Sequence, residues 1–148
     1  MDIKALLAED DFEDYLLFVE AFEKVSPAYK ISWVKNGLDC ITCLKGNKVP
    51  DIIFLDLNMP YKNGLECLQY IKSTESLAHL PVVIFSTSHY IKHIDIAYKS
   101  RADFYIVKPA GVGQLEAILA TVLDKLARGA ERATKENFVV RLSKVFHG

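Results

Sequence analysis

The chain has 148 residues, a length typical of one domain with its own hydrophobic core. Hydrophobic residues make up 51% and charged residues 25% of the sequence, and the formal net charge of -1 gives no electrostatic reason to expect nucleic-acid binding. No apolar stretch approaches the length of a membrane span, no signal peptide is recognisable, and three cysteines are an odd number for a disulfide framework. We therefore expect a cytoplasmic protein that binds neither membrane nor nucleic acid.

Five apolar, strand-like segments alternate along the chain with five helical patterns. The predicted strands cover residues 3–8, 31–34, 51–55, 82–85 and 104–107. The residues at helical spacing that we expect to face the core are Phe12, Tyr15, Leu16, Val19 and Phe22; Leu38, Ile41 and Leu44; Leu65, Leu68 and Ile71; Ile91, Ile94 and Tyr98; and Leu115, Ile118, Leu119, Val122 and Leu126.

This alternation predicts an α/β protein with a doubly wound, five-stranded parallel sheet that is covered by helices on both faces. Crossovers between parallel strands are right-handed, so a sheet covered on both faces must reverse its winding at one point. The flavodoxin-like (βα)5 arrangement, with strand order 2-1-3-4-5, reverses between the first and third strands. Ligands of such sheets bind at the carboxyl ends of the strands at that point.

Charged and hydroxyl side chains stand at the ends of four of the predicted strands. Glu9 and Asp10 follow the first strand, Asp56 follows the third, and Ser86 and Lys108 follow the fourth and fifth. Because the carboxyl ends of parallel strands lie on the same rim of a sheet, we expect these side chains to form one charged site.

Carboxylates that lie this close together repel one another unless one is protonated or a cation neutralises them. A cluster of oxygen ligands without histidine or paired cysteine suits Mg²⁺, with Mn²⁺ as the alternative, rather than zinc. A carboxylate beside such an ion can act as a nucleophile and form an aspartyl phosphate. Lys108 would then pair with one phosphoryl oxygen, and Ser86 would donate a hydrogen bond to another.

Four segments in order carry a resemblance to a known family: LLAEDD, IIFLDLNMPYKNG, PVVIFSTS and FYIVKPA. The sequence resembles the receiver domain of two-component response regulators over residues 1–127. The resemblance implies that Asp56 is the phosphoacceptor. It also implies a metal site made by Glu9, Asp10, Asp56 and the backbone carbonyl of Asn58.

The resemblance further implies which residues transmit phosphorylation to the rest of the domain. Ser86 matches the hydroxyl that senses the phosphoryl group, and Tyr105 matches the aromatic switch that turns inward on activation. Lys108 matches the family's invariant lysine, and the Lys108–Pro109 bond matches its cis peptide.

By the same resemblance we expect a phosphoacceptor receiver protein of a two-component or phosphorelay system. A sensor histidine kinase, a histidine phosphotransfer protein or a small phosphodonor would supply the phosphoryl group. The chain would catalyse only its own phosphorylation and slow dephosphorylation. Its output would be contact with a downstream protein effector through the face formed by the fourth helix, fifth strand and fifth helix, which could also form a homodimer.

The tail, residues 128–148, is too short to form an output domain. Its apolar part covers residues 137–142, with Val145 and Phe146 further on. Three arrangements are open: the tail docks on the protein's own surface, contacts a second subunit, or is disordered. We favour docking or partner contact.

Three rival functions fit parts of the pattern. A phosphatase with an aspartyl nucleophile needs a second acid two residues further on, where this chain has Asn58. A flavin-binding module needs a phosphate loop after the first strand, but residues 9–11 are all acidic and would repel phosphate without a metal. A receiver-like scaffold that is not phosphorylated remains open as the third.

Overall fold

The computed structural model describes residues 3–129 and 133–141. Its elements, in chain order, are β1 (Ile3–Ala8), α1 (Phe12–Val25), β2 (Tyr29–Val34), α2 (Gly37–Leu44), β3 (Ile52–Leu55), α3 (Gly64–Ser73), β4 (Val82–Ser86), α4 (Ile91–Lys99), β5 (Phe104–Val107), α5 (Val112–Ala127), α6 (Lys135–Phe138) and β6 (Val139–Val140). The strands form one parallel sheet in the order β2-β1-β3-β4-β5-β6. The predicted α/β fold and its order 2-1-3-4-5 are confirmed, and β6 is an additional strand.

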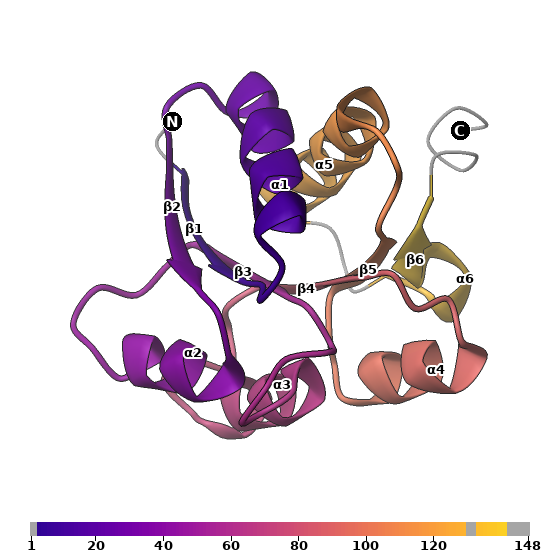
Figure 1. The fold of residues 1–148 in the computed structure, drawn as a ribbon. Helices are drawn as coiled ribbons and strands as arrows, with labels where there is room; N and C mark the ends of the chain where they lie inside the picture. The colour runs from indigo at the N-terminus through magenta and orange to yellow at the C-terminus, as the bar shows by residue number, and fades with distance from the viewer. Residues whose placement is uncertain (1–2, 130–132, 142–148) are drawn as a thin grey trace.

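Helices cover both faces of the sheet, with α1 and α5 on one face and α2, α3 and α4 on the other (Figure 1). Each face has its own core cluster of buried side chains. On the α1–α5 side, Phe18 packs edge-on against Phe54 at a centroid distance of 4.8 Å. Because helices cover both faces, every position of β3 and β4 is buried, and all are apolar except Ser86. No helix among the described residues is both long enough and apolar enough to cross a bilayer.

Several side chains predicted to face the core are instead exposed, and three of them lie in the first turn of a helix. Phe12 in α1, Leu38 in α2 and Ile91 in α4 are 57%, 51% and 73% exposed. These helices begin at the carboxyl rim of the sheet, where their first turns are open to solvent. Leu16, which is 48% exposed, was also predicted wrongly, because α1 buries Phe18, Ala21 and Phe22 instead.

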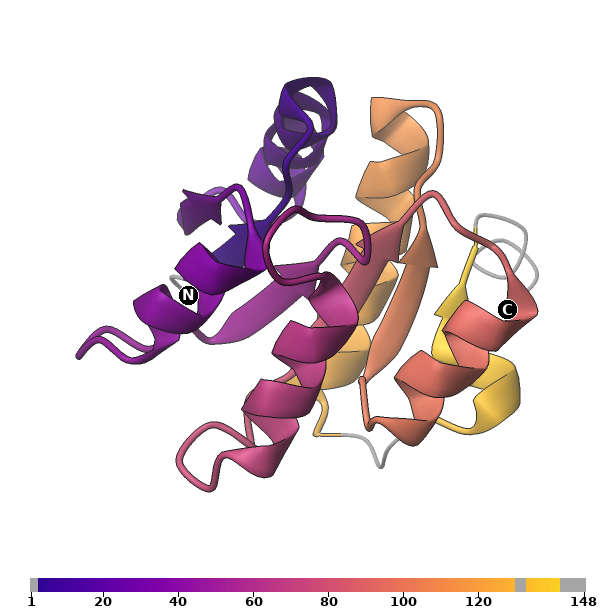
Figure 2. The same cartoon turned by 60° about the horizontal axis from the view of Figure 1, so that its bottom comes forward.

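The described part of the tail packs against the last strand of the five-stranded sheet. Val139 and Val140 pair in parallel with Tyr105 and Ile106 of β5. The preceding residue, Phe138, is fully buried. Figure 2 shows α6 and β6, in yellow, beside α4. The edge of β5 is therefore paired within the same chain, and the face predicted for partner contact carries α6 and β6 on it.

Two aromatic contacts and one ion pair hold this segment in place. The ring of Phe138 lies 5.2 Å from that of Tyr98 in α4 and 6.1 Å from that of Tyr105 in β5, both edge-on. Lys135 Nζ lies 2.7 Å from Asp95 Oδ1 in α4. Leu142, Val145 and Phe146, which also belong to the predicted apolar part of the tail, lie outside the described residues.

Candidate functional site

The structure brings the carboxylates of Glu9, Asp10 and Asp56 together at the carboxyl rim of the sheet. One oxygen atom from each lies within 4.8 Å of the other two. Glu9 is 0% exposed and Asp56 is 5% exposed, whereas Asp10 is open to solvent. The reversal of winding between β1 and β3 produces this juxtaposition, because these two strands are direct neighbours in the sheet.

Lys108 places its ammonium group in the centre of the site. Its Nζ lies 2.6 Å from Glu9 Oε1, 2.8 Å from Asp14 Oδ2 and 3.0 Å from Asp56 Oδ2. Burial alone would lower the pKa of Lys108, but the hydrogen bond to Asp14 and the close carboxylates of Glu9 and Asp56 outweigh it and raise the pKa. The lysine is therefore held as a cation among carboxylates.

Asp14 is a member of the site that sequence reasoning missed. It lies in the first turn of α1, where its N–H donates to the Asp11 side chain in an N-cap hydrogen bond of 2.9 Å. This cap fixes the start of the helix at the rim, and the Asp14 carboxylate then reaches Lys108. An N-cap signal at Asp11 in the sequence could have indicated that the helix begins there and that its first turn joins the site.

Glu9 is held rigidly by its backbone. Its N–H donates to the Val34 carbonyl at 2.9 Å, and Trp33 Nε1–H donates to the Glu9 carbonyl at 2.7 Å. Burial, with a smaller contribution from Asp56, raises the pKa of Glu9 and Lys108 opposes this, so that the net pKa is about 8. Glu9 Oε2 accepts from the Asp11 N–H at 3.2 Å, but Oε1 has no hydrogen-bond donor, since its short contact with Lys108 lacks hydrogen-bond geometry.

Asp56 is positioned by the turn that follows β3. Its N–H donates to the Ala8 carbonyl at 3.0 Å, and the Asn58 N–H donates to Asp56 Oδ1 at 3.1 Å. Gly64 begins α3 directly against this turn, and a Cβ there would overlap the Asp56 carbonyl oxygen. The close approach of α3 to the site therefore requires glycine at this position.

These residues fit a hard divalent cation. The donor set consists of carboxylate oxygens, which Mg²⁺ and Mn²⁺ prefer. Glu9 Oε1 is a buried carboxyl oxygen that accepts no hydrogen bond, and the exposed Asp10 leaves the site open on one side. The ligand role of the Asn58 carbonyl stays a prediction.

The two predicted switch residues are linked through Ser88. The Ser86 side chain is fully buried and its Oγ accepts from the Ser88 N–H at 3.2 Å. Tyr105 is also fully buried, and its hydroxyl donates to the Ser88 carbonyl at 2.8 Å. Burial raises the pKa of the Tyr105 hydroxyl, so it remains a neutral donor.

The predicted cis peptide at Lys108–Pro109 is wrong. No peptide bond among the described residues is cis, so this bond is trans. The trans form is favoured by about 0.5–1 kcal/mol for an ordinary bond before proline. The Lys108 N–H donates to the Ser86 carbonyl at 2.8 Å, which continues the β4–β5 pairing into this segment.

The fold and this rim of acids around one lysine define a receiver-type α/β protein. Residues 5–120 match the response regulator receiver domain, and the chain belongs to this family. It therefore acts in two-component signal transduction. Receiver domains of this family bind Mg²⁺ or Mn²⁺ in an acidic pocket and interact with histidine kinases and downstream effectors.

Individual relatives agree with this assignment. The chain is 31% identical over 116 residues to the probable methanogenesis regulatory protein FilR2 of Methanothrix harundinacea (strain 6Ac), which covers 75% of each chain. It is similar to the phosphorylated cyanobacterial phytochrome response regulator RcpA, with 31% identity, a TM-score of 0.79, and coverage of 90% of this chain and 100% of RcpA. It is also similar to the Mn²⁺-bound form of response regulator Rcp1, with 25% identity, a TM-score of 0.75, and coverage of 89% and 99%.

Proposed function

We propose that Asp56 accepts a phosphoryl group from a sensor histidine kinase, a histidine phosphotransfer protein or a small phosphodonor in the cytoplasm. The observation that carries this proposal is the placement of Asp56 between a buried ammonium group and two further carboxylates at one rim of the sheet. A bound Mg²⁺ or Mn²⁺ would be held by Glu9, Asp10 and Asp56, with the Asn58 carbonyl as a further ligand.

The chemistry is a displacement at phosphorus. A carboxylate oxygen of Asp56 attacks the phosphorus atom of the donor, and the bond from phosphorus to the donor breaks with its electron pair leaving on the donor. A bound Mg²⁺ or Mn²⁺ would neutralise part of the negative charge on the phosphoryl oxygens. Lys108 exchanges its carboxylate contacts for a phosphoryl oxygen, and Ser86 Oγ–H donates to another. Slow attack of water on the phosphorus atom breaks its bond to the Asp56 carboxylate and releases inorganic phosphate.

The phosphorylated state reaches the surface through contacts that already exist. When Ser86 Oγ turns toward the phosphoryl group, it gives up its contact with the Ser88 N–H, and Ser88 also holds the Tyr105 hydroxyl. Tyr105 in turn packs against Phe138 of the tail. We therefore place the output surface on α4 together with α6 and β6, as a two-state element that a downstream effector or a second copy recognises.

The phosphatase alternative is weaker in the structure as well as in the sequence. Position 58 holds an exposed asparagine, whose amide cannot protonate a leaving group. The phosphoramidate experiment below distinguishes the phosphoacceptor from a receiver-like scaffold that is not phosphorylated.

The test is incubation of the protein with Mg²⁺ and phosphoramidate, followed by mass spectrometry. We expect an acid-stable, base-labile phosphoryl adduct that needs the divalent cation. Asp56→Asn, which keeps the shape of the side chain, should abolish it. An adduct that persists in this variant would defeat the assignment of Asp56, and no adduct in the wild type would favour the scaffold.

A further inference from the structure

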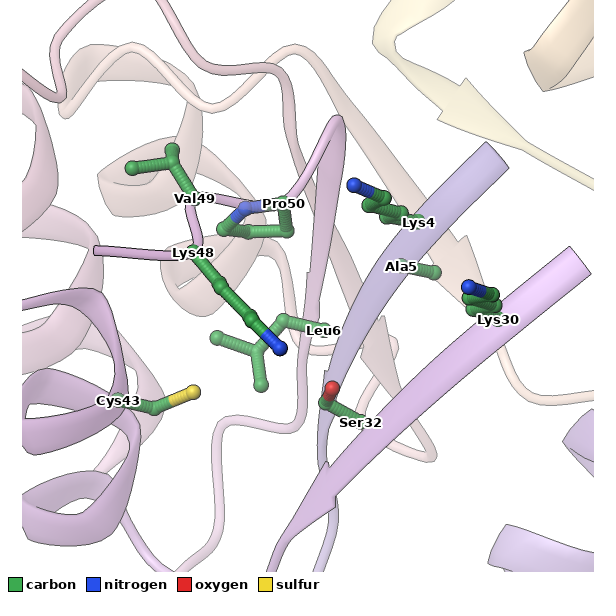
Figure 3. A pocket seen from close by; sticks show the side chains of 9 residues that line it. All are labelled: Lys4, Ala5, Leu6, Lys30, Ser32, Cys43, Lys48, Val49 and Pro50. Carbon is green, nitrogen blue, oxygen red and sulfur yellow. The ribbon is translucent and has the colours of Figure 1, made fainter. Parts of the chain in front are cut away.

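A second polar hollow lies at the opposite end of β1 and β2 from the acidic rim. Its volume is about 300 Å³, and the side chains that line it include Lys4, Leu6, Lys30, Ser32 and Lys48. Figure 3 shows Lys48 reaching from the loop after α2 toward Leu6 and Ser32 on the strands. The proposed phosphoacceptor function uses none of these residues.

The short length of α2 creates this hollow. The helix starts at the carboxyl rim and has 8 residues, which span about 12 Å. The 6 residues of β1 span about 20 Å. The helix therefore covers only one half of the strands, and the loop through Lys48, Val49 and Pro50 spans the other half without filling it.

The hollow concentrates positive charge. In the β1–β2 register Lys4 pairs with Lys30, so two ammonium-bearing side chains leave neighbouring strands on the same face. Like charges directly opposite each other destabilise a sheet. Lys48 adds a third cation, and no carboxylate belongs to the lining.

None of these three lysines forms an ion pair within the described part of the chain. The neighbouring Asp51 carboxylate accepts from the backbone N–H of Lys4 at 2.9 Å instead. The cations are thus available to an anion from solution.

We propose that this hollow binds a small phosphate ester of about mononucleotide size. A phosphate monoester carries a charge near -2 at pH 7, which suits a cluster of three ammonium groups and the Ser32 hydroxyl better than a single carboxylate does. The organic part would lie on Val49 and Pro50, which provide an apolar wall. A volume of 300 Å³ is at the small end of the range of ligand pockets and is larger than an inorganic phosphate ion would fill.

The test is isothermal titration of the whole chain with adenosine 5′-monophosphate, adenosine and inorganic phosphate as separate probes. We expect saturable binding of the monophosphate that weakens with added salt, much weaker binding of inorganic phosphate, and none of adenosine. Lys30→Gln and Lys48→Gln should each weaken binding about three- to tenfold. The matched control is Lys24→Gln, an exposed lysine in the last turn of α1.

Three results would overturn the proposal: no saturable binding of the monophosphate at millimolar concentration, equal loss of affinity in Lys24→Gln, or equal affinity for inorganic phosphate. Phosphorylation of Asp56 by phosphoramidate should be unchanged in both pocket variants. Because the two sites share no residue, failure of one assay leaves the other interpretable.

Discussion

Replacing Phe138 by alanine tests whether the tail is an integral part of the receiver. The ring is fully buried and contacts the rings of Tyr98 and Tyr105. Burying a phenylalanine side chain stabilises a fold by about 1.5–3 kcal/mol, and each aromatic pair adds about 0.5–1.5 kcal/mol. β6 has only 2 residues, so residues 135–140 can detach from the sheet while the rest of the domain stays folded. The substitution therefore cannot destabilise the domain by more than the free energy with which this segment binds to it.

We therefore expect Phe138→Ala to lower the free energy of unfolding by about 2–4 kcal/mol. At about 2–4 °C per kcal/mol for a chain of this size, the melting temperature should fall by roughly 4–16 °C. Thermal unfolding followed by circular dichroism measures the fall. Hydrogen exchange at the backbone amides of β5 should also become faster, because the edge of the strand loses its partner.

The matched control is Phe12→Ala, since Phe12 is 57% exposed at the opposite side of the sheet. Phe12→Ala should lower the free energy of unfolding by less than about 1 kcal/mol. Equal melting temperatures for the two variants would refute the reasoning, because the tail would then contribute no stability through Phe138.

Three further predictions concern charge. Lys108→Met should lower the stability of the metal-free protein by about 3–5 kcal/mol in urea unfolding, because Glu9 and Asp56 lose their counter-charge; an unchanged midpoint would contradict the geometry. Adding Mg²⁺ at a hundredfold excess over its Kd should raise the free energy of unfolding of the wild type by about 2.7 kcal/mol, and its melting temperature with it. The same addition should have a much smaller effect on Asp56→Asn. The contact with Lys135 lowers the pKa of Asp95 below its ordinary value of 3.8. The ion pair therefore stabilises the fold fully above pH 3.8, and this stabilisation is lost as the pH falls through the lower pKa that Asp95 has in the folded state. The melting temperatures of wild type and Lys135→Gln should therefore differ at neutral pH and converge in acid, and a difference that persists in acid would exclude this cause.

The fold and the location of the site could be predicted from the sequence because both depend on short-range patterns and one topological rule. Apolar runs at residues 3–8 and 104–107 coincide with β1 and β5. Once the strands are placed, the right-handed crossover fixes which strand ends are neighbours, and this brings Glu9 next to Asp56.

What could not be predicted depends on where elements end and on contacts between distant segments. The first turns of α1, α2 and α4 are open to solvent at the carboxyl rim, so apolar residues there follow helical spacing without being buried. Asp14 joins the site because Asp11 caps α1 and so places Asp14 in the first turn of the helix. The two-residue strand β6 is too short to give a period-2 pattern, and it forms only because β5 offers an open edge.

The most direct test of the central claim is to locate the phosphoryl group on the chain. After reaction with phosphoramidate and Mg²⁺, borohydride reduction converts an aspartyl phosphate to homoserine, and peptide mass spectrometry identifies the position. The account predicts homoserine at position 56 and at no other aspartate, with none formed when the divalent cation is chelated. Homoserine at position 10 or 14 with position 56 unmodified would contradict it.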